Sequence, residues 1–299
     1  MDTGRLAGRM CHAVMAGTIG GLLCVACADL AAQTATYSYT TILFPGARGT
    51  QVNGVNRAGD LVGSYRDAAN DVHGFLRRDG KFTSIDYPGA KSTVPRGISA
   101  SGDIVGQYSL PDTPAIAHGF LLTKQGKFTS VTVPGHANTV AVRVLSDGTV
   151  IGCYHDAGPD SMHAMKLVGG KLSALDRPNS MHNGATPDGK TFVGTFNDQT
   201  DGKSHGRSYV LNGGTFTLFD VPGSSTTSAQ DINAAGVIVG TYLTNGVSHG
   251  FVRERDVYTT LNAPGATTTN ANGISDDGAI VGSFVDAGGV TRGFIAIRK

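Results

Sequence analysis

The distribution of hydrophobic residues along the chain is typical of short β-strands. Between residues 97 and 134, the runs "DIVGQY", "HGFLLTK" and "KFTSVTV" follow one another, and Gly, Asp, Asn or Pro bounds each run. Runs rich in β-branched and aromatic residues form strands, and the Gly- and Asp-containing segments between them form turns. No segment beyond the N-terminus keeps an apolar period of 3.6 residues, so we expect strands and essentially no helix.

The same pattern of strands recurs along the chain. "GKFTSIDYPGA" at residues 80–90 returns as "GKFTSVTVPGH" at 126–136 and as "GTFTLFDVPGS" at 214–224. The turn prolines after these strands recur about every 44 residues, at Pro45, Pro88, Pro134, Pro178, Pro222 and Pro264. With the short run that ends in "GIS", each unit holds four strands, and six such units predict a β-propeller.

The two ends of the chain predict how this ring closes. "YSYTTILFPGA" begins with a lone fourth strand, and "RGFIAIRK" ends on a third strand that lacks its fourth. Pairing of residues 37–44 with residues 293–297 would complete one blade and leave no unpaired apolar end. We therefore predict an all-β fold, a six-bladed β-propeller of four-stranded antiparallel blades over residues 36–299. The expected blades are residues 50–89, 93–134, 139–178, 182–222, 226–264, and 268–299 with 36–45.

Two further markers recur with the same spacing. A Val-Gly-x-aromatic strand appears as "LVGSY", "IVGQY", "VIGCY", "FVGTF", "IVGTY" and "IVGSF", and a His-Gly-Phe strand follows it in most units. With these markers the chain resembles the extracellular HAF-type repeats over residues 37–297, and His163-Ala164-Met165 comes closest to the family name. The fourth unit departs from the pattern with His205-Gly-Arg, and the sixth has Arg292 in place of the histidine. The resemblance implies export and a propeller-like fold, and it implies no particular activity.

The N-terminal residues have the pattern of a signal peptide. Two arginines precede an apolar segment of about 15 residues, and Ala26-Cys27-Ala28 supplies the small residues of a cleavage site after Ala28. Cleavage after Ala32 is the second choice. Lipid anchoring at Cys27 is a weaker alternative, because Cys24 stands where a leucine is normally expected. The apolar segment is short for a membrane anchor, so we expect residues 1–28 to be removed and the protein to be secreted or periplasmic.

Charge and cysteine content narrow the classes of partner. The formal net charge is +1, and basic residues are scattered among nearly as many acidic ones, which argues against a nucleic-acid partner. No apolar run beyond the leader is long enough to span a membrane, and we expect a monomer. Three of the four cysteines lie in the leader, so we expect no intrachain disulfide, and Cys153 in "VIGCY" should be a buried, inert thiol.

A mostly polar ring is expected near the mouth of the central channel. A residue that breaks a repeat on a loop-bearing face is a better functional candidate than one that recurs in every blade. The equivalent positions of the innermost strands are Asn53, Arg96, Val142, Asn183, Gln230 and Asn272. Arg143 follows Val142, and two guanidiniums near one mouth suit a bidentate grip on a carboxylate or sulfate. A water-filled channel lining is the alternative.

Blade three carries the sharpest irregularity. His136 replaces the alanine of a Pro-Gly-Ala turn, His155 and Asp156 begin the loop after the second strand, and His182 lies in the turn to blade four. These loops emerge on one face of a propeller, so the side chains are expected to approach one another, as in a zinc site or an acid-base centre. Exposed loop histidines without a joint role are the alternative.

The histidines that open the third strands should serve the fold. They lie off the axis, too far apart to share a metal ion, and we expect them to hydrogen-bond to nearby turn aspartates. They are His73, His118, His163, His205 and His249.

The sequence leaves more than one function open. The first is a non-catalytic binding or scaffold module for an extracellular glycan or protein, without a cofactor. The second is a metal-assisted hydrolase or lyase that acts on an extracellular polymer through a divalent metal at the blade-three histidines. A purely structural envelope protein is the third. Beyond the leader the chain lacks a nucleophile elbow, a phosphate loop and paired Cys-x-x-Cys ligands, which favours the first.

Overall fold

The computed structural model describes residues 36–136, 138–156, 162–173, 179–199 and 205–299. The expected signal peptide, with its cleavage sites at Ala28 or Ala32 and the alternative at Cys27, lies outside the described residues, as does Pro178. The described residues form 24 strands joined by turns. Within them, no helix is long and apolar enough to cross a membrane.

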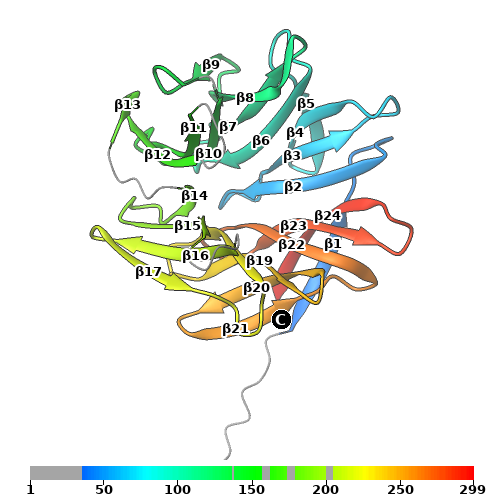
Figure 1. The fold of residues 1–299 in the computed structure, drawn as a ribbon. Coiled ribbons are helices and arrows are strands. Elements are labelled where there is room, and N and C mark those ends of the chain that lie inside the picture. The colour runs from blue at the N-terminus through cyan, green and yellow to red at the C-terminus, as the bar shows by residue number, and fades with distance from the viewer. Residues whose placement is uncertain (1–35, 137, 157–161, 174–178, 200–204) are drawn as a thin grey trace, which may run out of the picture. The chain divides into compact units, whose positions relative to one another are not determined.

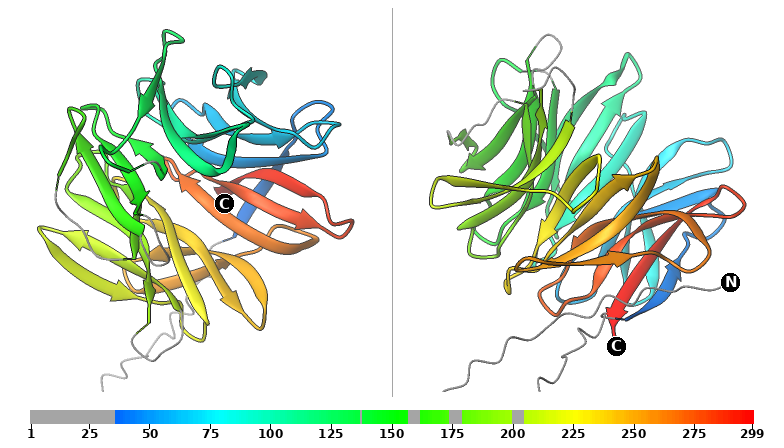
Figure 2. Two further views of the ribbon diagram at one scale, coloured as in Figure 1. Left: turned by 45° about the horizontal axis from the view of Figure 1, so that its top comes forward. Right: turned by 60° about the horizontal axis from the view of Figure 1, so that its bottom comes forward.

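The strands form six four-stranded antiparallel sheets arranged around a common centre, which we number as blades in chain order (Figures 1 and 2). Blade one holds β2 (Gly49–Val55), β3 (Leu61–Arg66), β4 (Val72–Arg78) and β5 (Lys81–Ile85). Blade two holds β6 (Ser92–Ile98), β7 (Ile104–Leu110), β8 (Thr113–Leu122) and β9 (Phe128–Val131). Blade three holds β10 (Asn138–Val144), β11 (Val150–His155), β12 (Met162–Val168) and β13 (Lys171–Leu172).

The second half of the ring has the same order of strands. Blade four holds β14 (Ser180–Ala185), β15 (Thr191–Asp198), β16 (His205–Asn212) and β17 (Thr215–Phe219). Blade five holds β18 (Thr226–Ile232), β19 (Ile238–Thr244), β20 (Val247–Glu254) and β21 (Val257–Leu261). Blade six holds β22 (Ala266–Ile274), β23 (Ile280–Asp286), β24 (Thr291–Arg298) and β1 (Tyr37–Ile42). The first strand of every blade contacts the first strands of both neighbouring blades, so these strands surround the central axis.

The ring closes through β1, the first described strand. β1 pairs antiparallel with β24, with Tyr37 opposite Arg298 and Ile42 opposite Gly293. The first and last described strands therefore lie side by side in one sheet (Figure 1). The predicted fold class and the predicted mode of closure are confirmed.

The Val-Gly-x-aromatic marker forms the second strand of each blade and packs against the innermost strand. Its Val or Ile is fully buried in every blade. A Cβ atom on the following glycine would lie 1.9–2.3 Å from a carbonyl oxygen of the innermost strand. No side chain fits there, which explains why the repeat keeps this glycine at Gly63, Gly106, Gly152, Gly194, Gly240 and Gly282.

The third strand supplies a large, fully buried core side chain in each blade. The residue opposite the marker glycine has no exposed surface in any blade; the set is Phe75, Phe120, Met165, Tyr209, Phe251 and Phe294. Tyr209 pairs with Gly194 as Phe75 pairs with Gly63. The alignment of His205-Gly-Arg with His-Gly-Phe was therefore wrong by two residues, and Arg207 occupies the histidine position of blade four.

The Pro-Gly turn carries the chain from an outermost strand to the next innermost strand. Gly46 has a φ of 77°, in the left-handed region that favours glycine, and the amide of Ala47 donates to the carbonyl of Phe44 (3.1 Å). The amide of Phe44 donates to the Thr50 hydroxyl (2.9 Å). The same bond recurs in the pairs Tyr87–Thr93, Val221–Thr227 and Ala263–Thr269. The repeated turn thus fixes where each new blade begins.

Candidate functional site

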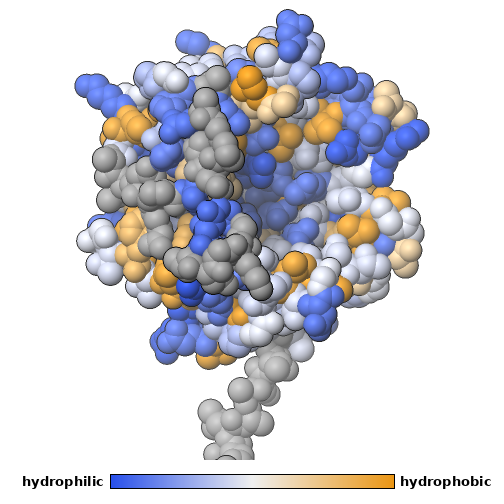
Figure 3. Space-filling model, in the orientation of Figure 1, coloured by the Kyte–Doolittle hydropathy of each residue, from blue (hydrophilic) through white to orange (hydrophobic). Residues whose placement is uncertain are grey.

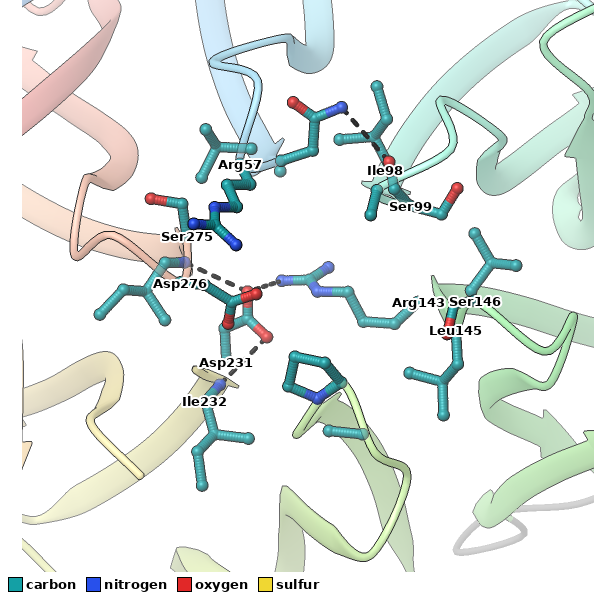
Figure 4. Close-up of a pocket in the computed structure, with 18 residues that line it drawn as sticks. Arg57, Ile98, Ser99, Arg143, Leu145, Ser146, Asp231, Ile232, Ser275 and Asp276 are labelled. Atoms are coloured by element: carbon teal, nitrogen blue, oxygen red, sulfur yellow. Dashed lines mark hydrogen bonds and ion pairs between the residues drawn. The ribbon is translucent and has the colours of Figure 1, made fainter. Parts of the chain in front are cut away.

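A cavity of about 170 Å³ lies where the innermost strands end, close to the central axis (Figure 4). Every blade contributes to its wall. Near its centre, Arg143 from β10 and Asp231 from β18 point toward each other, and the Nη2 atom of Arg143 lies 3.2 Å from Oδ2 of Asp231. Their side chains are only 12% and 10% exposed, so the ion pair is largely withdrawn from water.

Arg143 connects four blades. Its Nη1 donates to the carbonyl of Arg96 in blade two (2.8 Å), and its Nη2 donates to the carbonyl of Asn272 in blade six (2.8 Å). With the ion pair to Asp231 in blade five, the guanidinium holds blade three to three other blades near the axis. A planar guanidinium with five donors is well suited to this, because it bonds in several directions at once.

Asp231 is held by donors on each oxygen. Its Oδ1 accepts from the amide of Ile232 (3.0 Å), and its Oδ2 accepts from the amide of Ile274 in blade six (3.1 Å) as well as from Arg143. Burial raises the pKa of the Asp231 carboxyl, while the Arg143 charge and the two amides oppose that rise. The carboxylate is thus tolerated at depth only because it is bonded on all sides.

Four glycines make room for the axial pair. The positions equivalent to Arg143 and Asp231 in the other blades are Gly54, Gly97, Gly184 and Gly273. A Cβ atom on Gly184 would lie 2.6 Å from the Cα of Asp231, and one on Gly97 would lie 3.1 Å from the Cδ of Arg143. Sequence reasoning missed Asp231. Its signal was that only two of six equivalent positions are not glycine, and that these two carry opposite charges.

The predicted polar ring coincides with a β-bulge in each innermost strand. Each ladder to the second strand shifts register at this residue. The side-chain amides of Asn53, Asn183 and Asn272 donate to a carbonyl of the next blade's innermost strand (2.7–2.8 Å). These amides join neighbouring blades. Gln230 donates to the Ser228 hydroxyl (2.7 Å) instead.

The two arginines do not form the expected joint grip on an external anion. Arg143 already holds the carboxylate of Asp231. Arg96 donates from Nη2 to the side chain of Gln107 (3.1 Å), and burial lowers the pKa of its guanidinium. That expectation was wrong because the chain supplies its own anion, Asp231 of blade five. Val142, the ring residue of blade three, is buried.

The blade-three residues form a smaller cluster than expected. Asp156 lies between two imidazoles, with Oδ1 2.7 Å from Nδ1 of His136 and Oδ2 3.0 Å from Nε2 of His163. His155 faces the Cys153 sulfur instead (3.7 Å), and burial, with the charge of His163, lowers its pKa. The contact between His163 and Asp156 is equivalent to the contact between His73 and Asp67 in blade one, so it belongs to the repeated structure of the blades.

His182 is not part of this cluster. It is fully buried, with Nδ1 2.7 Å from the hydroxyl of Tyr209. The expected convergence of His136, His155 and His182 was therefore wrong, because His182 belongs to an innermost strand and faces the core. Across the described residues, no group of three His, Cys, Asp or Glu side chains is arranged to hold a metal ion.

The third-strand histidines of blades one and three are bonded to turn aspartates, as predicted, whereas Nδ1 of His249 lies 2.9 Å from the side-chain oxygen of Asn262. Nδ1 of His73 lies 2.8 Å from Asp86, and its Nε2 lies 3.6 Å from Asp67. Desolvation lowers the pKa of His73, but the hydrogen bonds and charges of the two aspartates outweigh it and leave the pKa raised. Arg207 makes the equivalent contacts in blade four, to Asp220 (2.9 Å) and Asp198 (3.3 Å). The His73 and Arg207 side chains connect the ends of the second and fourth strands of their blades to the third strand.

Cys153 should be chemically inert in the folded protein. It is 2% exposed, and burial raises the pKa of its thiol to about 12, with Arg96 opposing the rise. We expect a thiol reagent at about pH 8 to modify it more than about a thousandfold more slowly than a free cysteine. The measurement is labelling of the chain without residues 1–35, followed by mass spectrometry, with denatured protein as the control. Labelling of the native protein within minutes would contradict the burial.

Further cavities open at seams between blades. One of about 350 Å³ lies between blades six and one, lined by residues 48–51, 64–66, 70, 72 and 289–291. One of about 290 Å³ lies at the equivalent seam between blades four and five, lined by residues 198, 205–207, 220 and 224–226. Figure 3 shows one face of the molecule. This face has a hollow near its middle, and hydrophilic side chains surround the hollow.

Comparison with known proteins places the fold among β-propellers. No protein-family model matches the chain, and no curated protein matches it. The propeller domain of the Trilobed protease from Pyrococcus furiosus aligns with a TM-score of 0.53 at 9% identity, over 86% of this chain and 96% of that one. TolB from Acinetobacter baumannii aligns with a TM-score of 0.53 at 14% identity, over 83% of this chain and 64% of TolB.

A lectin is also among the similar structures. A mutant of the Aleuria aurantia lectin, in complex with Fucalpha1-6GlcNAc, aligns with a TM-score of 0.50 at 13% identity, over 89% of this chain and 94% of the lectin. At these identities the likeness shows the fold. The protein is thus a six-bladed β-propeller of four-stranded antiparallel blades.

Proposed function

We propose that this chain is an exported, non-catalytic binding module that recognises an extracellular glycan or protein. The observation that carries the proposal is the pair of polar cavities at equivalent seams between blades. The polar side chains that recur in the repeat, such as Asn53 and His73, form hydrogen bonds within the propeller and so serve its structure. The lectin and TolB among the similar structures support it, as does the resemblance of the repeat to exported HAF-type proteins. The expected signal peptide supports export to the periplasm or beyond.

A glycan array followed by calorimetric titration tests the proposal. We expect the chain without its leader to bind at least one class of glycan or one envelope protein saturably, and to release it unchanged. Substitutions at exposed residues of the seam cavities should weaken binding about tenfold or more, because each removes a hydrogen bond to the ligand. Cleavage or elimination of the bound glycan would contradict a non-catalytic role.

The proposal requires no metal, which can be tested directly. We expect purified protein to contain well under one equivalent of zinc or another transition metal, and EDTA to leave its thermal midpoint unchanged, since a ligand bound only by the folded state would raise it. One equivalent of metal that is lost in a His136→Ala, His163→Ala variant would contradict this. That result would favour the metal-assisted hydrolase or lyase.

A further inference from the structure

The cavity between blades six and one differs from the cavity between blades four and five by its uncompensated positive charge. Arg48 and Arg66 both line it and both are exposed. The amide of Arg48 donates to the carbonyl of Arg66 (2.8 Å), so the two side chains start from adjacent points of the backbone. Arg66 does not follow the repeat, because the equivalent positions in the other blades hold Ser109, His155, Asn197, Leu243 and Val285. The position equivalent to Arg48 in blade two holds Lys91, which is paired with Asp71.

Among the described residues, no carboxylate lines this cavity, and the acidic residues near it are engaged elsewhere. Asp71 is paired with Lys91 (2.8 Å), and Asp67 lies 3.6 Å from His73. Asp286 is paired with Arg292. Within the described part of the chain, the Arg48 guanidinium has no hydrogen bond or ion pair, and Arg66 bonds only to the carbonyl of Asn70 (3.3 Å). Two cationic groups therefore remain available to a ligand.

The equivalent seam between blades four and five provides the contrast. Among the described residues that line it, the arginine is Arg207, which is held by Asp220 (2.9 Å) and Asp198 (3.3 Å); both aspartates also line that cavity. Its cation is neutralised within the fold. The uncompensated positive charge at the seam between blades six and one is thus absent from the seam between blades four and five, and it is not a necessary consequence of propeller geometry.

The remaining lining groups suit a ligand with several hydroxyl groups. Gln51 and Asn70 bring side-chain amides, and Ser64 brings a hydroxyl. The volume of about 350 Å³ falls in the range of about 300–1,000 Å³ usual for small-molecule sites. An extended peptide would lack a strand to join, because β24 is paired on both sides and the free edge of β2 faces the axis.

We propose that this seam binds an acidic saccharide. Arg48 and Arg66 form ion pairs with the carboxylate of a uronic acid residue, and the side-chain amides of Gln51 and Asn70 form hydrogen bonds with its hydroxyl groups. Hydrogen bonds from a guanidinium to a carboxylate are charge-assisted and therefore stronger than those between neutral groups, which gives the specificity for an acidic sugar. The inference rests on the proposed binding function and names its ligand class and its site.

Calorimetric titration with oligogalacturonate, alginate and hyaluronan fragments tests this inference, with neutral galacto-oligosaccharide beside them. We expect at least one uronate to bind, the neutral sugar to bind more than about tenfold less tightly, and Arg48→Ala or Arg66→Ala to weaken uronate binding about tenfold or more. Arg57→Ala is the matched control, because Arg57 is an exposed arginine of the axial cavity and should leave binding unchanged.

Several results would overturn the assignment. They are failure of every uronate to bind, uronate binding that survives both arginine substitutions, and equally tight binding of a polyglutamate peptide. Binding of a neutral glycan or an envelope protein that ignores Arg48 and Arg66 would overturn this inference and leave the proposed function standing. Absence of any glycan or protein ligand would overturn the proposed function itself.

Discussion

Replacing Asp231 with leucine while Arg143 remains should lower the free energy of unfolding by about 3–5 kcal/mol, and Arg143→Met should have a similar effect. Each change leaves an unpaired charge at a site where both side chains are nearly buried. Loss of Arg143 also frees the carbonyls of Arg96 and Asn272, which it bonds. The measurement is urea-induced unfolding followed by circular dichroism, with the slope of the transition checked for each variant.

The double variant separates the interaction energy between Arg143 and Asp231 from the cost of burying each charge. Arg143→Met with Asp231→Leu should lose much less than the sum of the single effects, with a coupling energy of about 2 kcal/mol or more. The matched control is Arg298 with Glu254, an exposed pair that also joins two blades, for which the coupling should stay below about 1 kcal/mol. Strictly additive effects at Arg143 and Asp231 would contradict the account of the axial pair.

Gly240→Ala should destabilise the protein by about 3 kcal/mol, because a Cβ atom there would lie 2.1 Å from the carbonyl oxygen of Ser228. The innermost and second strands of blade five would have to separate to admit it. Gly206→Ala is the control, since its nearest neighbour is the Cβ of Thr226 at an ordinary 3.6 Å. Thermal unfolding of both variants checks the prediction, and equal midpoints would contradict the steric explanation of the repeat.

The fold was predictable because its constraints are local and repeated. Gly240 and its equivalents recur at fixed spacing because the second strand of each blade must pack closely against the innermost strand. Phe251 and its equivalents recur because each blade has a core to fill, so the spacing of these residues indicates the number and order of the blades. The closing strand was predictable from the single unpaired fourth strand at residues 37–42. The register of blade four was not, because Arg207 performs the role of a histidine and the local motif no longer marks its place.

The site was harder to predict because its residues meet from distant blades. Arg143 was singled out, but its partner Asp231 comes from 88 positions further along the chain, and only the closed ring brings the two together. His182 was misplaced because its side chain turns into the core, toward Tyr209, and spacing alone does not show the side on which a residue lies. Arg66 breaks the repeat, and that irregularity was its only signal in the sequence.

The central claim is that the propeller binds an extracellular ligand at its seams and does not transform it. Equilibrium dialysis of the protein against a uronate oligosaccharide, followed by mass spectrometry of the recovered sugar, tests this most directly. We predict saturable retention at about one ligand per chain, with the sugar recovered intact and retention reduced about tenfold or more by Arg48→Ala. No retention of the sugar, or recovery of shortened or unsaturated products, would contradict the account.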